Sequence, residues 1–516
     1  MAELASFLDC DTLEKAHVFM QALEEPIRLD CYIGGLFGYA ETENIPLLDS
    51  FEPKTGRLYA RMPITQEAGV ELAIDHAKKA FPAWSKTTRA YRSDCLRRIA
   101  DLIQEHREHF AVWESIDQGK SLERARVEVD RAVSNFSYFS TYILHEQTPA
   151  RMIDATSTSA SVLTYEHRSP VGVFALISPW NMPLYLLTWK IAPCLAFGCT
   201  AVAKPSEITS MSAFYLALLI HTSQILPPGV LNIILGDGPT TGAALVASPN
   251  IAGVSFTGGT ATGIAIRKAT AHQIGKHLSL ELGGKNPLLL FSDALVPTPE
   301  HPNPLAHFAA LAATAAFTNQ GEICLCTSRI YVEKASYPAF LAAFTAHVRG
   351  TYVPGTETMG ALASRAHYDK VRSYLSLAYR EGATFQLGSV PPEEPEGGYW
   401  VGPVVLTGVS PGSAVLREEI FGPVVVVVPF EGEEEGVKLA NDSGYGLAAV
   451  VVTKDGGRMR RVGEAMEAGV VWVNGWLQRE LGTPFGGVKG SGEGREGGEY
   501  SRGVFTVVKT MHLPGY

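Results

Sequence analysis

Seven cysteines carry the most reactive side chains of this 516-residue chain, at positions 10, 31, 95, 194, 199, 324 and 326. Their number is small and odd, which argues against a disulfide framework and fits a reducing compartment. No CxxC pair or histidine at ligand spacing accompanies them, so we expect no metal site. Cys324 and Cys326 stand out because they follow a long apolar run and precede a predicted strand. A thiolate at that place could add to a carbonyl carbon.

This pattern alone leaves alternatives open. A pair of cysteines does not indicate its reactive member, and a cysteine beside an apolar run is often a small buried side chain. A cysteine hydrolase would need a histidine base, which no motif here supplies.

Two glycine clusters could be mistaken for nucleotide-binding fingerprints. The stretch from Gly236 to Gly242 follows a predicted strand and opens a helix, but it has one residue too many for GxGxxG. Gly258 and Gly263 have the spacing of a P-loop, but Ile264 and Ala265 stand where that loop needs Lys and Ser or Thr. The glycines alone predict turns at the carboxyl ends of strands, which is where α/β sheets bind ligands.

The elements around these motifs alternate between strand and helix, which predicts doubly wound parallel sheets. In the first series we expect strands at Val171–Ser178, Thr200–Lys204, Leu231–Leu235, Gly253–Thr257 and His277–Leu282. Its helices are expected at Met211–Thr222, Thr241–Ala247 and Thr260–His272, and helices of the first 140 residues would complete this domain.

A second α/β series begins after Gly284. It comprises a helix at Leu305–Phe317 and strands at Arg329–Val332, Gly422–Val428, Ala448–Thr453 and Gly469–Asn474. Four prolines between positions 297 and 304 predict a surface excursion before its helix. Arg151–Arg168 and Gly503–Leu513 alternate like strands outside both series, so we expect them to pair as an arm used in oligomerisation.

Six motifs in this chain resemble those of the aldehyde dehydrogenase superfamily, in that family's order and over nearly the whole chain. They are the nucleophile motif Phe317 to Arg329, the glutamate motif Glu281-Leu-Gly-Gly-Lys285, the asparagine motif Pro179-Trp-Asn181, the ribose-binding motif Lys204-Pro-Ser-Glu207, the second cofactor motif Glu419-Ile-Phe-Gly-Pro423, and Pro484-Phe-Gly-Gly-Val-Lys489 followed by Ser491-Gly492 and Gly494-Arg-Glu496. Each alone would be weak evidence, but six in order are specific.

The resemblance implies an α/β architecture, the aldehyde dehydrogenase fold, with two doubly wound domains and a small β oligomerisation arm. It divides the chain into an NAD-binding domain (1–147 and 170–281), a catalytic domain (282–482) and the arm (148–169 and 483–516). A homodimer or homotetramer is the expected assembly.

The same resemblance assigns three catalytic residues. Cys324 matches the family's nucleophile by its spacing to Arg329, so Cys326 is interpreted as structural. The Asn181 amide and the Cys324 N–H would stabilise the oxyanion, and Glu281 would activate the water that hydrolyses the thioester. The cofactor would be NAD, because a carboxylate at Glu207 repels the 2′-phosphate of NADP. The expected cofactor-binding residues are Ser178, Pro179, Trp180, Lys204, Ser206, Glu207, Gly238, Gly242, Phe256, Thr257, Gly258, Gly259, Leu282, Glu419 and Phe421.

Three passages, around Asn181, Cys324 and Arg479, look most like the dehydrogenases of 2-aminomuconic semialdehyde in kynurenine (tryptophan) catabolism, with those of 2-hydroxymuconic semialdehyde close behind. Both substrates carry a carboxylate, which needs a cation. We therefore predict that Arg479 and Arg126 contact the substrate, together with Trp189, although neighbouring Arg124 blurs the alignment of Arg126. A retinal or general aldehyde dehydrogenase with an apolar tunnel is the alternative enzyme, and a non-catalytic structural relative is the alternative of another class.

Composition and charge exclude other classes. The net charge is −10 with no run of basic residues, which argues against a nucleic-acid partner. The longest apolar runs fall far short of the ~20 residues that a membrane span needs. The first 30 residues include seven acids where a targeting peptide would be basic or acid-poor, so the expected location is cytoplasmic.

Overall fold

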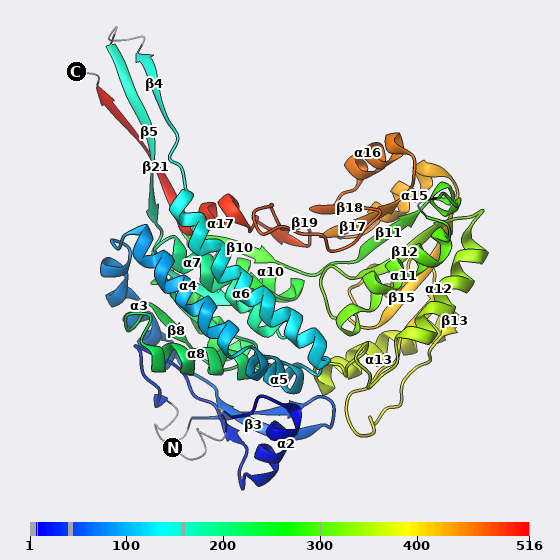
Figure 1. Ribbon diagram of the computed structural model, residues 1–516, viewed down its shortest axis with the longest axis horizontal. Coiled ribbons are helices and arrows are strands. Elements are labelled where there is room, and N and C mark those ends of the chain that lie inside the picture. Colours follow the sequence, from blue (N-terminus) through cyan, green and yellow to red (C-terminus); the bar gives the residue numbers. More distant parts are fainter. Residues whose placement is uncertain (1–6, 8, 40–44, 156–159, 300, 515–516) are drawn as a thin grey trace.

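The fold is known from a computed structural model that describes residues 7, 9–39, 45–155, 160–299 and 301–514. Two large sheets lie in separate lobes, and a narrow three-stranded arm projects from the first lobe (Figure 1). The predicted architecture of two α/β units with a β arm is therefore confirmed, although several boundaries differ.

The first sheet contains six strands with the order β20-β10-β9-β6-β7-β8. The five strands from β10 to β8 in this order run parallel, and only β20 is antiparallel. The strand order reverses at β6, which creates a topological switch point where such sheets bind ligands. The strands are β6 Val173–Ile177, β7 Thr200–Lys204, β8 Leu231–Ile233, β9 Gly253–Thr257, β10 His277–Glu281 and β20 Gly492–Glu493.

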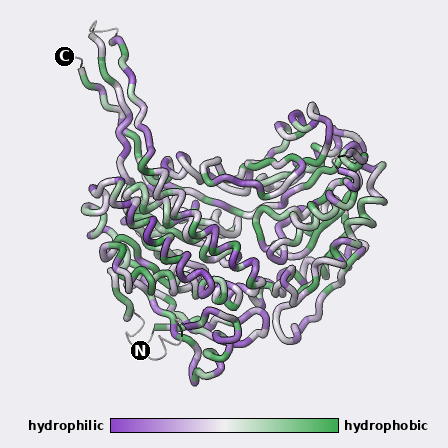
Figure 2. Tube along the Cα trace, in the orientation of Figure 1, coloured by the Kyte–Doolittle hydropathy of each residue, from purple (hydrophilic) through white to green (hydrophobic). Residues whose placement is uncertain are grey.

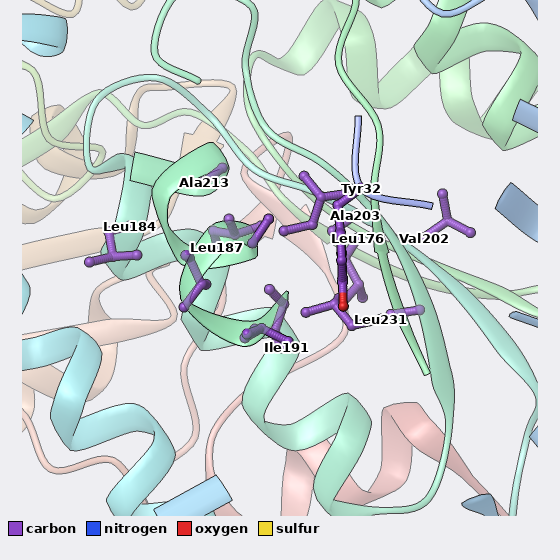
Figure 3. Close-up of a cluster of buried hydrophobic side chains, with 14 of the residues drawn as sticks. Tyr32, Leu176, Leu184, Leu187, Ile191, Val202, Ala203, Ala213 and Leu231 are labelled. Carbon is purple, nitrogen blue, oxygen red and sulfur yellow. The ribbon is translucent and has the colours of Figure 1, made fainter. Parts of the chain in front are cut away.

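Helices from both halves of the chain cover this sheet. Helix α3 (Glu67–Trp84) contacts β7, and α7 (Pro183–Ala196) contacts β6 and β7. Since α7 is apolar on all sides, it is buried between the sheet and α6 (Leu122–His145). Leu187 and Ile191 of α7 join Leu176 and Leu231 of the sheet in one cluster (Figure 3). The other helices are α4 Arg89–Glu105, α5 Arg107–Gln118, α8 Met211–Ser223, α9 Ala243–Ala247 and α10 Thr260–Thr270.

The second sheet contains seven strands with the order β13-β14-β15-β12-β11-β17-β18, parallel except for the β13–β14 pair. Its strands are β11 Asn286–Leu290, β12 Thr327–Glu333, β13 Thr384–Leu387, β14 Val404–Thr407, β15 Val424–Phe430, β17 Ala448–Val452 and β18 Val470–Val473. Its helices are α11 Pro304–Phe317, α12 Tyr337–Thr351, α13 Arg365–Arg380, α14 Ala414–Arg417, α15 Gly432–Asn441 and α16 Gly456–Ala465.

Strand β11 lies near the centre of this sheet, and the sequence analysis missed it. Pro287 near its start argues against a central strand, because proline cannot donate a ladder hydrogen bond. The structure accommodates Pro287 by a register shift between Asn286 and Pro287.

The arm consists of β4 (Ala150–Ala155), β5 (Ala160–Pro170) and β21 (Thr506–Pro514). The predicted pairing of Arg151–Arg168 with Gly503–Leu513 is confirmed, because β5 pairs with β21. Hydrophobic and hydrophilic stretches alternate along the arm (Figure 2). Its starting boundary at 483 was wrong. Residues 492–505 belong to the first lobe, because β20 pairs with β10 and α17 (Gly498–Phe505) packs on α7.

The remaining elements lie at the periphery. Helix α2 (Leu13–Ala22) and the small sheet of β1 (Ile27–Arg28), β2 (Leu47–Glu52) and β3 (Arg57–Pro63) precede the first lobe, and β16 (Tyr445–Gly446) pairs with β19 (Val488–Lys489). Within the described part of the chain, no helix combines the length and apolar character of a membrane span. The same residues contain no cluster of three potential metal ligands.

Leu187 tests the packing of α7. It is 1% exposed, so replacement by alanine would leave a cavity and reduce the free energy of unfolding by about 2–5 kcal/mol. We expect Leu187→Ala to lower the Tm in thermal unfolding, whereas Leu144→Ala, at a half-exposed position of α6, leaves it nearly unchanged. Equal Tm values for the two variants would contradict this assignment of α7 to the core.

Candidate active site

The candidate site lies between the two lobes, where residues that follow strands of the first sheet meet residues that precede strands of the second sheet. A cavity of about 340 Å³ opens there, with Cys324 and Asn181 in its wall. Among the residues predicted to bind cofactor, eight line this cavity: Pro179, Trp180, Thr257, Gly258, Gly259, Leu282, Glu419 and Phe421. Residues from motifs that are far apart in the sequence therefore meet at one cavity, as expected if these motifs form one site.

The loop that carries Cys324 begins where α11 ends. Asn319, Gln320 and Gly321 have positive φ angles of 52°, 55° and 73°, which turn the chain sharply after Phe317. The Asn286 side chain then donates to the Cys324 carbonyl at 2.7 Å and so fixes the loop to β11. The main-chain N–H of Cys324 has no hydrogen-bond partner among the described residues, which leaves it free to bind an oxyanion.

The two cysteines of the motif point into different surroundings. Cys324 lines the cavity, whereas Cys326 packs in the core of the second lobe, and its Sγ lies 3.6 Å from the Thr318 carbonyl. Burial raises the pKa of the Cys326 thiol to about 12. Burial also raises the pKa of Cys324, and Glu419 and Glu281 raise it further, while the Arg479 cation opposes them. This placement supports Cys324 as the nucleophile.

Asn181 follows β6 and closely precedes α7. Its side chain is 3% exposed and donates to the Glu322 carbonyl at 2.8 Å, two residues before Cys324. The amide therefore already lies against the nucleophile loop. This position supports its predicted role as an oxyanion donor.

Glu281 lies at the end of β10 with both carboxyl oxygens buried. Neither oxygen has a hydrogen-bond partner among the described residues, and the main chain at Gly486 lies against Oε1, where a Cβ atom would come within 2.8 Å. Burial raises the pKa of Glu281 well above its ordinary value, and the neighbouring Glu496 raises it further. A carboxylate whose pKa is raised in this way is a stronger base than one in water, which suits a residue that takes a proton from water.

Glu496 and Lys190 form a buried pair beside Glu281 that the sequence analysis did not single out. Glu496 accepts from Trp189 at 2.6 Å and from Ser255 at 3.0 Å, and its Oε1 lies 3.3 Å from the Lys190 ammonium. All these partners of the carboxylate come from elements of the first lobe. No local pattern around Glu496 indicates this, because the contacts span more than 200 positions.

The residues predicted to bind the adenosine half of NAD lie at the ends of β6, β7 and β9. Lys204 is buried, and its ammonium contacts the Pro205 carbonyl at 3.1 Å and Glu207 at 3.4 Å. The Ser178 hydroxyl is buried without a partner in the described part of the chain. Ser206 follows Lys204 in the same turn, and Gly242 lies beside the Lys204 side chain. Gly238 begins the helical turn that follows β8, and the Phe256 ring lies over Gly258.

On the opposite side, Glu419 and Phe421 close the cavity together with His367, which the sequence analysis missed. Glu419 accepts from the Gly284 N–H at 2.8 Å. His367 donates from Nε2 to the Phe421 carbonyl at 2.6 Å, and its ring lies 4.8 Å from that of Trp180. Burial lowers the pKa of His367 to about 3, so the imidazole is neutral.

Two arginines converge on one phenol at the other end of the site. Arg131 Nη2 and Arg479 Nη1 donate to the Tyr185 hydroxyl at 3.0 and 3.3 Å. Arg479 also lies over the Trp189 and Phe485 rings, and its Nε and Nη2 are buried without partners among the described residues. None of the salt bridges formed by the described residues includes either guanidinium. These are the features of an anion-binding site.

The prediction for Arg126 was wrong. Its guanidinium pairs with Glu108 at 2.9 Å on the outer side of α6 and does not face the cavity. Arg131 lies on the inward side, five residues further along the same helix. Arg124 also faces inward but is bound to Glu128 at 3.1 Å.

The fold and the site combine a parallel sheet of the dinucleotide-binding type with a cavity that holds a cysteine and an asparagine, and with a buried glutamate close by. The chain belongs to the aldehyde dehydrogenase family, whose model matches residues 39–511. This confirms the resemblance of the six motifs.

Individual relatives narrow the comparison. A 2-aminomuconic semialdehyde dehydrogenase of Danio rerio is 45% identical and covers 94% of this chain and 97% of its own. A 2-hydroxymuconic semialdehyde dehydrogenase of Pseudomonas sp. (strain CF600) is 38% identical over 90% of this chain and 95% of its own. A crystal structure of betaine aldehyde dehydrogenase from Staphylococcus aureus with NAD+ has 34% identity and a TM-score of 0.86, with 96% and 95% of the two chains covered.

The different surroundings of the two cysteines lead to a first test of the site. Cys324→Ala should abolish the burst of NADH and any acyl-enzyme seen by mass spectrometry, because no thioester can form. Cys326→Ala should keep both, since its thiol faces the core. A burst that survives in Cys324→Ala would reject this nucleophile.

The raised pKa of Glu281 leads to a second test. Because only the ionised carboxylate accepts a proton, hydrolysis of the thioester should accelerate as pH rises through that raised pKa. Glu281→Gln should keep the NADH burst, slow steady-state turnover by about 10²–10⁴-fold, and lose this pH dependence. Rapid-mixing kinetics over a range of pH separates the two phases. An unchanged steady-state pH profile in the variant would contradict the role of Glu281.

Proposed function

We propose that this aldehyde dehydrogenase oxidises an aldehyde to a carboxylic acid with NAD through a thioester on Cys324. Its thiolate adds to the aldehyde carbon, and the resulting oxyanion accepts from the Asn181 amide and the Cys324 N–H. Loss of hydride from that carbon leaves the thioester. Glu281 then takes a proton from water as the water oxygen attacks the thioester carbon, the C–S bond breaks, and the carboxylic acid and the Cys324 thiolate are released.

The residues present fit NAD. Ser178 offers a hydroxyl that is buried without a partner among the described residues, and Lys204 with Glu207 provides a cation and an acid for ribose hydroxyls. No atom lies within 4 Å of where a Gly259 Cβ would stand, so phosphate can approach the start of α10. NAD, when bound, supplies the hydride acceptor. The first sheet with its helices would be the NAD-binding domain and the second lobe the catalytic domain.

The substrate that the site supports best is 2-aminomuconate 6-semialdehyde, oxidised to 2-aminomuconate in kynurenine catabolism. The observation that carries this proposal is the Arg131–Tyr185–Arg479 cluster. Two cations share one hydroxyl, and neither forms an ion pair with an acid of the described residues, so a substrate carboxylate at the far end from the aldehyde could bind there. Relatives named for the amino and hydroxy forms of this semialdehyde are consistent with it.

A retinal or general aldehyde dehydrogenase would leave these guanidiniums buried against an apolar substrate, which is costly. The intact cysteine, glutamate and asparagine argue against a non-catalytic relative. We further propose that copies of the chain assemble through the arm, whose Met152, Val507 and Val508 are exposed apolar residues, and that the protein works in the cytoplasm.

Replacing the arginines tests the substrate class. Arg131→Met and Arg479→Met should each raise the KM for 2-hydroxymuconic semialdehyde, a more stable surrogate, by about 10–100-fold, because a charged hydrogen bond is lost. The KM for acetaldehyde should change by less than about threefold, because this aldehyde makes no such bond. NADH absorbance gives both values.

Arg126→Met is the matched control, since it removes an arginine from the same helix on its outer side. It should leave both KM values unchanged. If Arg131→Met and Arg479→Met affected acetaldehyde as strongly as the acidic semialdehyde, the family assignment would stand and the carboxylate site would be rejected.

A further inference from the structure

A cluster of three buried charges and one partly buried arginine lies beside Asn181, and none of its members lines the cavity. The Lys120 side chain is fully buried between two buried carboxylates, Glu128 in direct contact and Glu114 at 3.4 Å. Arg124 binds the other oxygen of Glu128 at 3.1 Å. Such a cluster needs an explanation, because replacing buried ion pairs with apolar residues often leaves stability unchanged or improves it.

The cluster holds both ends of the turn that leads from Asn181 into α7. The Lys120 ammonium donates to the Asn181 carbonyl at 3.2 Å. The Glu114 carboxylate accepts from the Leu184 N–H at 3.0 Å, which is one of the unsatisfied donors at the start of α7. The Lys120–Glu114 pair therefore fixes the main chain on both sides of Met182 and Pro183.

The nucleophile loop contacts the same turn from the other side. Asn319 Nδ2 donates to the Asn181 carbonyl at 3.2 Å, while the Asn181 side chain donates to the Glu322 carbonyl at 2.8 Å. The Asn181 carbonyl is thus shared between Lys120 and the loop that carries Cys324. Any shift of Lys120 would move the amide relative to the cysteine.

We propose that Lys120, held by Glu114 and Glu128, is a positioning residue that sets the main chain of Asn181 so that its amide faces the oxyanion formed at Cys324. The ammonium does not line the cavity and touches no reacting atom. It acts only through Asn181, so this inference rests on the oxyanion role proposed for that amide. Preorganised donors lose much of their effect when they are displaced by about an ångström.

The test is a double-mutant cycle. Lys120→Met combined with Glu128→Gln removes the ammonium together with one carboxylate, so the net charge of the cluster is unchanged, and the amide oxygen of the new glutamine can still accept from Arg124. We expect the rate of the NADH burst to fall by about 10–100-fold, with the Kd for NAD unchanged within about twofold. In an Asn181→Ala background, the same replacement should slow the burst no further.

Arg126→Met is again the matched control. It breaks the ion pair with Glu108, which joins α5 and α6 on their outer side, and it should leave the burst unchanged. Circular dichroism and Tm confirm folding. If the double variant does not fold, Glu128→Gln alone deprives the ammonium of its nearest partner with little change of shape, and it should slow the burst by about 3–10-fold, again only when Asn181 is present.

The outcomes separate the two proposals. Equal slowing with and without Asn181, or no slowing at all, would reject Lys120 as a positioning residue while the oxyanion role stands. A normal burst in Asn181→Ala itself would reject the oxyanion role, and the inference with it.

Discussion

The site depends on the short connection between the two sheets, from Leu282 to Lys285. It joins Glu281, the last residue of β10, to Asn286, the first residue of β11, and its Leu282 and Gly283 line the cavity. Asn286 then holds the Cys324 carbonyl at 2.7 Å and accepts from the Ala448 N–H at 3.0 Å, so the nucleophile loop is fixed to the centre of the second sheet. Gly283 is required in this connection, because a Cβ atom there would clash with the Glu419 carboxylate. Glu281, Cys324 and Glu419 are thus all positioned by this one segment of chain.

Burial determines the electrostatics of the site. It raises the pKa of both Cys324 and Glu281, because the low-dielectric surroundings disfavour both anions. The Arg479 cation opposes this effect on both groups and lies at the end where we propose that the substrate carboxylate binds. A bound acidic substrate would neutralise that cation. Arg479, which we propose to bind the substrate carboxylate, therefore also lowers the pKa of Cys324 and Glu281.

One face of helix α6 contributes three charged residues around the site. Arg124 and Glu128 belong to the charge cluster beside Asn181, and Arg131 reaches Tyr185, because residues four and seven positions apart lie on one side of a helix. Arg126 is two positions, or about 200°, away from Arg124 and so faces outward to Glu108. Choosing Arg126 from the sequence was wrong because alignment to a motif fixes the position along a helix only to within a residue or two, and a shift of that size reverses the face.

The sequence by itself determined the class of enzyme, most strand positions of the first sheet, and the identity of Cys324, Glu281 and Asn181 as candidates, because each lies in a local motif at the end of a strand or helix. It did not determine strand β11, where Pro287 obscured a central strand, or the end of the arm, where β20 pairs with a strand more than 200 positions away. Only the tertiary structure revealed the Arg131–Tyr185–Arg479 cluster and the contact of Lys120 with Asn181. Such contacts join residues that lie far apart in the chain. No local pattern of spacing or polarity specifies which of these side chains meet in the folded protein.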